Sequence, residues 1–122
     1  MEESASANRF AIFRNVDSTV ERRAGEVVFS NGDPADVLYV VRSGEVAVMV
    51  GSQEVERLGE GGMFGEMALI DEGPRSATVV AATDCELIPI DRPTFRHLVQ
   101  EAPFFAENVM KVMAERLRRV AR

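Results

Sequence analysis

FGEMALIDEGPRSATV, residues 64–79, is the stretch from which the rest of the chain can be interpreted. Glycines at positions 59, 61, 62 and 65 lie just before this stretch or at its start. Glycine lets the backbone approach a ligand closely or adopt a positive φ angle. Residues 66–69 are good helix formers, and they predict a single helical turn whose first N–H groups have no intrahelical partner. Such a turn is suited to binding an anion.

Arg75 is the side chain that would complete a phosphate site. Pro74 fixes the backbone just before it, and residues 76–80 predict a strand, so we expect the guanidinium at a strand start, where packing can aim it. A guanidinium and several backbone amides together suit one phosphate. Glu66 would repel a phosphate, but its carboxylate could accept a hydrogen bond from a hydroxyl of the same ligand. The combination predicts a site for a sugar phosphate.

These residues resemble the phosphate-binding segment of cyclic nucleotide-binding domains. In that family FGE is followed by a small apolar turn and, after a loop, by PR, two small residues and T. The resemblance implies that Gly65, Met67 and Ala68 offer backbone contacts, that Glu66 binds the ribose 2′-hydroxyl and that Arg75 binds the cyclic phosphate. The ligand-binding set that it implies is Phe64, Gly65, Glu66, Met67, Ala68, Arg75, Ser76 and Ala77.

Outside this segment, the pattern of apolar residues predicts short strands joined by tight turns. The expected strands are residues 27–29, 37–42, 45–50, 53–58, 76–82 and 85–90. The period then changes: Asp91 is a candidate N-cap for a helix that runs through Gln100, and an amphipathic helix follows from Phe104. Residues 9–13 suggest a short N-terminal helix after a flexible start at residues 1–7.

The expected fold is a single α+β domain spanning residues 1–122. It is an antiparallel jelly-roll-like β-barrel with a short N-terminal helix and two C-terminal helices. Closure of the sheet hides the strand edges and leaves an opening for a small ligand. The resemblance extends upstream over residues 25–29, 32–33, 38–41 and 43–46, and so covers nearly the whole chain. It is similar to the sensor domain of regulators of the catabolite activator type.

Composition excludes several other classes of function. The net charge of -6 argues against nonspecific binding of nucleic acid, which needs a basic surface. Cys85 is the only cysteine, so an internal disulfide and a thiolate metal cluster are excluded, and a reducing cytoplasm fits. The sequence shows neither a membrane-spanning run nor a secretory signal. We therefore expect a cytoplasmic protein without a metal and without a membrane or nucleic-acid partner.

No residue pattern points to catalysis. A cupin-type enzyme of similar barrel shape would need two or three histidine ligands for its metal, whereas His97 is the only histidine. A second alternative is a scaffold of the same fold that binds nothing, which differs only in whether Glu66 and Arg75 converge. For Glu66 alone, a further alternative is an exposed carboxylate at a helix N-terminus, where the helix dipole favours it.

The sequence favours cyclic AMP over cyclic GMP as ligand, with modest discrimination. In eukaryotic members of the family, a hydroxyl after the arginine is associated with cyclic GMP, but Arg-Ser-Ala also resembles the bacterial cyclic AMP regulators, so Ser76 leaves both open. Those regulators also bring hydroxyl side chains from the last helix to the purine. This chain has Val120 and Ala121 in that region, which removes a polar source of selectivity.

The C-terminal helices are expected to carry the signal. Ligand binding should shift the helical turn and repack four apolar residues, Phe95, Leu98, Phe104 and Phe105. The last helix ends in basic residues, which the helix dipole accounts for. In the catabolite activator type this helix forms a dimer seam and leads to a DNA-binding unit. We therefore expect a homodimer through this helix or an effector protein as partner, and the sequence leaves open whether the chain is part of a longer protein.

Overall fold

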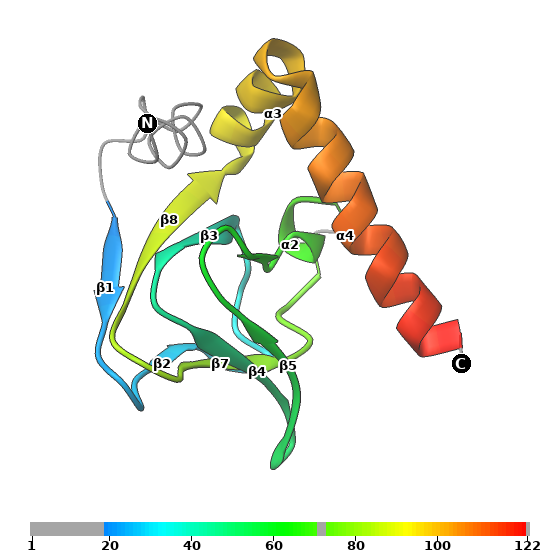
Figure 1. The fold of residues 1–122 in the computed structure, drawn as a ribbon. Helices are drawn as coiled ribbons and strands as arrows, with labels where there is room; N and C mark the ends of the chain where they lie inside the picture. The colour runs from blue at the N-terminus through cyan, green and yellow to red at the C-terminus, as the bar shows by residue number, and fades with distance from the viewer. Residues whose placement is uncertain (1–18, 71–72, 122) are drawn as a thin grey trace.

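The computed structural model describes residues 19–70 and 73–121, with side chains through residue 118. The helix expected at residues 9–13 and the flexible start at residues 1–7 lie outside the described residues. Figure 1 shows two sheets at one end of the molecule and a helical layer over them. The strands are β1 (Val20–Arg22), β2 (Val27–Phe29), β3 (Val37–Ser43), β4 (Val46–Val50), β5 (Gln53–Leu58), β6 (Met63–Phe64), β7 (Thr78–Ala81) and β8 (Cys85–Asp91). The helices are α2 (Met67–Ile70), α3 (Arg92–Glu101) and α4 (Pro103–Ala121).

The two sheets are antiparallel and have four strands each. One has the order β1-β8-β3-β6, and the other has the order β2-β7-β4-β5. Strands that follow one another in the sequence therefore mostly lie in different sheets, as in a jelly roll. The predicted α+β jelly-roll-like fold is confirmed, although its strands form two facing sheets and not one closed ring of hydrogen bonds.

Strand β3 separates two hydrophobic cores, because successive side chains of a strand point to opposite faces. Leu38 and Val40 pack against the helices, while Val41 packs between the two sheets and Tyr39 lies against that second core. The same alternation continues in β8, where Leu87 faces the other sheet and Ile88 faces the helices. Both faces of the first sheet are therefore covered.

The helix-side core joins all three described helices. Leu69 of α2, Leu98 of α3 and Phe105 and Val109 of α4 belong to one buried cluster. Phe104 was expected to pack with them, but it is 84% exposed and lies outside this core. Within the described residues, no helix is both long enough and apolar enough to cross a membrane.

Most predicted elements are confirmed within one or two residues, and the differences have local causes. The strand expected from Ser76 begins at Thr78, because the backbone of Arg75 pairs with residues 32–33. The N–H of Arg75 donates to Asp33 O at 2.9 Å, and its carbonyl accepts from Gly32 N at 2.8 Å. Arg75 consequently lies three residues before the strand and not at its start. The short strands β1 and β6 were not predicted, since two or three residues show no period.

The N-cap prediction for α3 is confirmed. Asp91 has an extended backbone, and its Oδ1 accepts a hydrogen bond from Thr94 N at 2.9 Å. A single residue, Ala102, separates α3 from α4, and its N–H donates to Leu98 O at 2.8 Å. Pro103 is the first residue of α4, a position where its missing N–H costs nothing.

Candidate ligand-binding site

A cavity of about 400 Å³ opens beside α2, between the β4–β5 hairpin, the segment before β7 and the second half of α4. Its volume is within the range of small-molecule sites. All eight residues of the predicted ligand-binding set line it: Phe64, Gly65, Glu66, Met67, Ala68, Arg75, Ser76 and Ala77. The fold therefore brings together two parts of the sequence, residues 64–68 and residues 75–77.

Arg75 is a buried cation at one end of this cavity. Its side chain is only 6% exposed, and its guanidinium stacks on the ring of Phe29 at 4.0 Å from the ring centroid. Nη2 donates to Val37 O at 2.8 Å, and Nη1 donates to Gly65 O at a longer 3.3 Å. Among the described residues, Nε is the buried side-chain atom without a hydrogen-bond partner. A cation that is held in place but incompletely paired is suited to receive an anion.

Burial lowers the pKa of the Arg75 guanidinium, and the nearby Tyr39, Asp36 and Asp33 oppose this shift. An arginine side chain nevertheless stays protonated in proteins. The charge is therefore permanent, and no carboxylate forms an ion pair with it within the described residues. A ligand phosphate would supply the missing negative charge.

Gly65 is required by the position of Arg75. Its φ angle is +79°, in a region that side chains rarely adopt, and a Cβ at this position would lie 2.7 Å from Arg75 Nη1. The residue therefore lets the chain turn from β6 into α2 and leaves room for the guanidinium. Its carbonyl also accepts from Ala68 N at 3.2 Å, so the N–H of Ala68 already has one partner within the turn.

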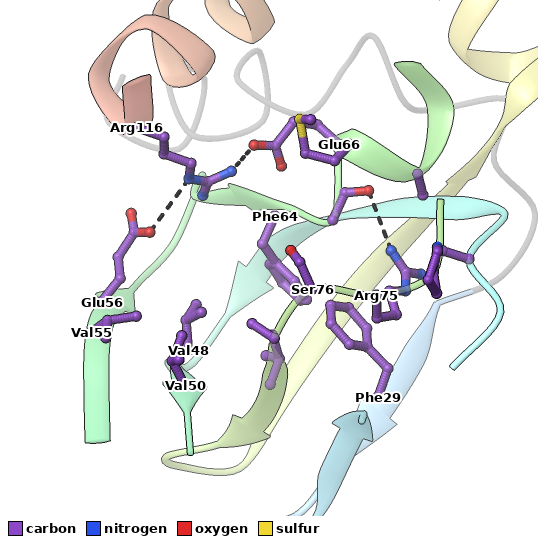
Figure 2. Close-up of a pocket in the computed structure, with 17 residues that line it drawn as sticks. Phe29, Val48, Val50, Val55, Glu56, Phe64, Glu66, Arg75, Ser76 and Arg116 are labelled. Atoms are coloured by element: carbon purple, nitrogen blue, oxygen red, sulfur yellow. Dashed lines mark hydrogen bonds and ion pairs between the residues drawn. The ribbon is translucent and has the colours of Figure 1, made fainter. Parts of the chain in front are cut away.

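Glu66 is buried, with 2% of the side chain exposed, and it pairs with Arg116 of α4. The interpretation of Glu66 as an exposed carboxylate at a helix end is therefore wrong. Arg116 Nη2 donates to Met63 O at 2.8 Å, and Arg116 Nε lies 3.4 Å from Glu56 Oε1. Figure 2 shows this arginine between the two carboxylates, on the side of the cavity opposite to Arg75. Charge pairing is what makes a buried carboxylate tolerable here.

Arg116 and Glu56 also line the cavity, but they were not predicted from the sequence. Arg116 was assigned to the basic end of the last helix, where the helix dipole alone accounts for it. The spacing along the helix did carry a signal. Val109 is buried, and Met113, four residues later, packs on the core. Arg116 follows Val109 by seven residues and therefore lies on the same face of the helix. Glu56 had no such signal, because three of the six residues of β5, Glu54, Glu56 and Arg57, are charged.

The end of the cavity away from Arg75 is mainly apolar. Val48, Val50 and Val55 line it from the β4–β5 hairpin, and Glu56 and Arg116 are its polar groups. A flat apolar ring system fits such a wall, while a charged group fits the Arg75 end. No group of three or more His, Cys, Asp or Glu side chains that could bind a metal occurs in the described part of the chain.

The model of the cyclic nucleotide-binding domain family matches residues 19–102, which contain both β-sheets, α2 and α3. The chain belongs to this family. The cyclic AMP receptor protein of Thermus thermophilus is 41% identical over 99 residues, which are 77% of this chain and 46% of that protein. A CRP-like cAMP-activated global transcriptional regulator of Mycobacterium tuberculosis is 32% identical over 100 residues, 78% of this chain and 45% of that protein. The chain thus spans about half the length of these curated relatives.

Solved structures share the fold. The crystal structure of the Thermus thermophilus catabolite activator protein matches with a TM-score of 0.76 and 34% identity, over 98% of this chain and 55% of that one. A second solved structure matches with a TM-score of 0.77 and 26% identity, over 93% of this chain and 94% of that one. It comes from work on a cyclic-GMP-dependent signalling pathway that regulates bacterial phytopathogenesis. The predicted membership of the cyclic nucleotide-binding family is confirmed.

Proposed function

We propose that this domain senses a cyclic nucleotide, cyclic AMP in preference to cyclic GMP, and passes a conformational change through α3 and α4. The observation that carries the proposal is the convergence of Arg75 and Glu66 on one cavity. They lie nine positions apart in the sequence, both are buried, and both line the same cavity. Arg116 compensates the burial of Glu66, but a buried Arg75 without an ion pair among the described residues is costly in a scaffold that binds no anion.

Each part of a cyclic nucleotide has a counterpart in the cavity. The cyclic phosphate would accept from the guanidinium of Arg75, whose Nε lacks a partner, and the backbone of residues 65–68 lies beside it. The ribose 2′-hydroxyl would donate to the carboxylate of Glu66. The purine would lie on the valines of the β4–β5 hairpin. The lining of the cavity contains no histidine, so it does not support the cupin alternative, and we propose no catalytic residue.

The preference for cyclic AMP is supported by the two curated relatives, both of which are named for cyclic AMP. The similarity to a structure from a cyclic-GMP-dependent pathway keeps cyclic GMP in the test. Discrimination should be modest because Val120 and Ala121 carry no hydroxyl that could hydrogen-bond the purine. Calorimetric titration with both nucleotides measures it, and tighter binding of cyclic GMP would reverse the choice.

Arg116 offers a route from the ligand to α4. It pairs with Glu66, the residue assigned to the ribose, and it belongs to a helix that packs on α2 and α3 through the common core. A hydroxyl that binds Glu66 would change the balance of this ion pair, and α4 would respond. Because the relatives are about twice as long, the domain that receives the signal is a further part of the proposal, either a second copy of this chain or an effector protein.

A thermal-shift experiment tests the proposal. A ligand that binds only the native state at about 100 times its dissociation constant stabilises that state by about 2.7 kcal/mol, enough to raise the melting temperature by several degrees. Cyclic AMP should produce this shift, and linear AMP should produce much less. Arg42→Ala, which removes an arginine that is 53% exposed and pairs with Glu86, serves as a control that keeps the shift. Failure of both cyclic nucleotides to raise the melting temperature would favour the non-binding scaffold.

A further inference from the structure

Helix α2 is a single turn that has the cavity on one side and α3 on another. Met67 and Ala68 line the cavity. The carbonyl groups of Ala68 and Leu69 accept hydrogen bonds from Arg92, with Nη1 at 2.7 Å from Leu69 O and Nη2 at 3.2 Å from Ala68 O. The last carbonyls of a helix have no partner within that helix, so in a helix of four residues these external bonds matter more than usual.

The backbone at Arg92 is held in place at the start of α3. It is the first residue of α3, directly after Asp91, which ends β8 and caps the helix through its hydrogen bond with Thr94 N. Pro93 restricts the backbone of the same turn. The side chain is partly buried. Its planar guanidinium therefore reaches from a rigid junction of strand and helix to two successive carbonyls, a geometry that a flexible ammonium reproduces poorly.

Apolar packing also joins α2 and α3. Leu69 and Leu98 share the helix-side core, and apolar contacts are non-directional, so they allow one surface to slide over the other. Hydrogen bonds weaken steeply when their angle or length changes. The pair of bonds from Arg92 is thus a directional connection between the turn that lines the cavity and the first turn of α3.

We infer that Arg92 is a positioning residue, which couples the place of α2 to the place of α3 and so passes ligand binding to the helices. The inference rests on the proposed function. When a ligand draws the backbone of residues 65–68 towards itself, Ala68 O and Leu69 O move as well. Arg92 either follows them, which turns the start of α3, or loses its bonds. A residue that only stabilised the fold would leave the response of α3 and α4 to saturating ligand intact.

Amide hydrogen exchange of the unaltered protein and of Arg92→Gln tests this, first without ligand and then with saturating cyclic AMP. Without ligand, Arg92→Gln removes the charged donor of the bonds to Ala68 O and Leu69 O, which should loosen α2. The amides of Ala68 and Leu69, which donate to Gly65 O and Glu66 O within this turn, should then exchange about tenfold faster. With ligand, protection should still appear at residues 64–79, but the added protection at residues 92–118 should fall to less than about half of that in the unaltered protein. Arg92→Lys should lie between the two, because an ammonium is a single point donor.

Arg96→Gln is the matched control, since Arg96 lies in the same helix, carries the same charge and is exposed. It should behave as the unaltered protein does in both arms. If the unaltered protein binds cyclic AMP and protects its helices, but Arg92→Gln shows the same protection at residues 92–118, the role of Arg92 is wrong and the proposed function stands. If the unaltered protein fails to bind, the proposed function is wrong and the relay through Arg92 falls with it.

Discussion

Arg75 is more than a charge placed near a cavity, because its surroundings fix the direction of its donors. Phe29 supports one face of the guanidinium, and Val37 O and Gly65 O hold its terminal nitrogens. The group is therefore oriented before a ligand arrives, which reduces the entropy lost on binding. A phosphate that meets it would form charge-assisted bonds in a site largely shielded from water.

The substitution Arg75→Ala should consequently weaken cyclic AMP binding by about 2 to 5 kcal/mol, or roughly thirtyfold to several thousandfold. Arg75→Lys should recover only part of this loss, because an ammonium presents one point charge and cannot meet two phosphate oxygens in parallel. Isothermal titration calorimetry measures both. The Arg42→Ala protein, with a substitution remote from the cavity, should bind as the unaltered protein does. Equal affinity of the Arg75→Ala protein would show that the phosphate does not bind at this residue.

Glu66→Gln should lose less affinity than Arg75→Ala, since an amide oxygen can still accept from the ribose 2′-hydroxyl. Loss of the carboxylate also weakens the pair with Arg116, so we expect the free energy of unfolding to fall by about 1 to 3 kcal/mol. The unaltered protein and the Glu66→Gln protein should bind a 2′-deoxy cyclic nucleotide with the same affinity. A difference that persists with the 2′-deoxy ligand would place the effect of Glu66 in the fold and not in the ribose contact.

The residues that sequence inspection found, and those that it missed, differ in a physical way. The eight predicted residues lie within one short stretch, residues 64–79, whose glycines, proline and arginine are rarely found together for another reason. Glu56 and Arg92 come from segments whose local sequence solvated strand and helix faces explain, and Arg116 is indicated only by its spacing from Val109 on α4. Their roles depend on which way each side chain points after the sheets and helices have packed, and a single sequence does not contain that direction.

At the level of elements, the alternation of apolar residues was sufficient for the long strands, and the pattern Asp-Arg-Pro-Thr was sufficient for the start of α3. β6 was not predicted, because it consists of two residues and is defined only by its pairing with Tyr39 and Val40. The delayed start of β7 has the same origin, since Arg75 finds its backbone partners in Asp33 and Gly32. Tertiary hydrogen bonds set these boundaries, and local propensity does not report them.

The cap of α3 gives a prediction for acid stability. Hydrogen bonds from Thr94 lower the pKa of Asp91. Its folded-state pKa therefore lies below its unfolded value, so the cap contributes stability above the unfolded pKa and loses it as the pH falls through the folded pKa. Asp91→Ala should cost about 1 kcal/mol near neutral pH, and the cost should shrink towards pH ~2.

Asp91→Asn is the matched control, because its amide oxygen can cap the helix without titrating. Urea unfolding of the three proteins across this pH range measures the differences in free energy. The Asn protein should be nearly as stable as the unaltered one at neutral pH, and relatively more stable in acid. A cost of Asp91→Ala that stayed constant with pH would show that the ionised carboxylate has no part in the cap.

At the scale of the whole molecule, α4 combines an inner face that completes the domain with an outer face that nothing in the described structure covers. Val109 and Phe105 pack on the core, whereas Met110 and Leu117 are 61% and 73% exposed. Met110 and Leu117 are seven residues apart, so they lie on one stripe of the helix, at the spacing that two helices use when they pack along each other. Exposed apolar residues along one stripe are typical of an interaction surface.

We therefore predict that two copies of the chain associate through this stripe of α4. The basic residues of the same helix oppose the approach of a second copy, and salt screens charges that are exposed, so association should be stronger at high ionic strength. Leu117→Glu should shift the protein towards monomer in sedimentation equilibrium, because it buries a charge in the seam. Val27→Glu alters another exposed apolar residue, on β2 and far from α4 in the fold, and should leave association unchanged. If the unaltered protein stays monomeric at high salt and high concentration, with and without cyclic AMP, the stripe serves a different partner and the dimer prediction is wrong.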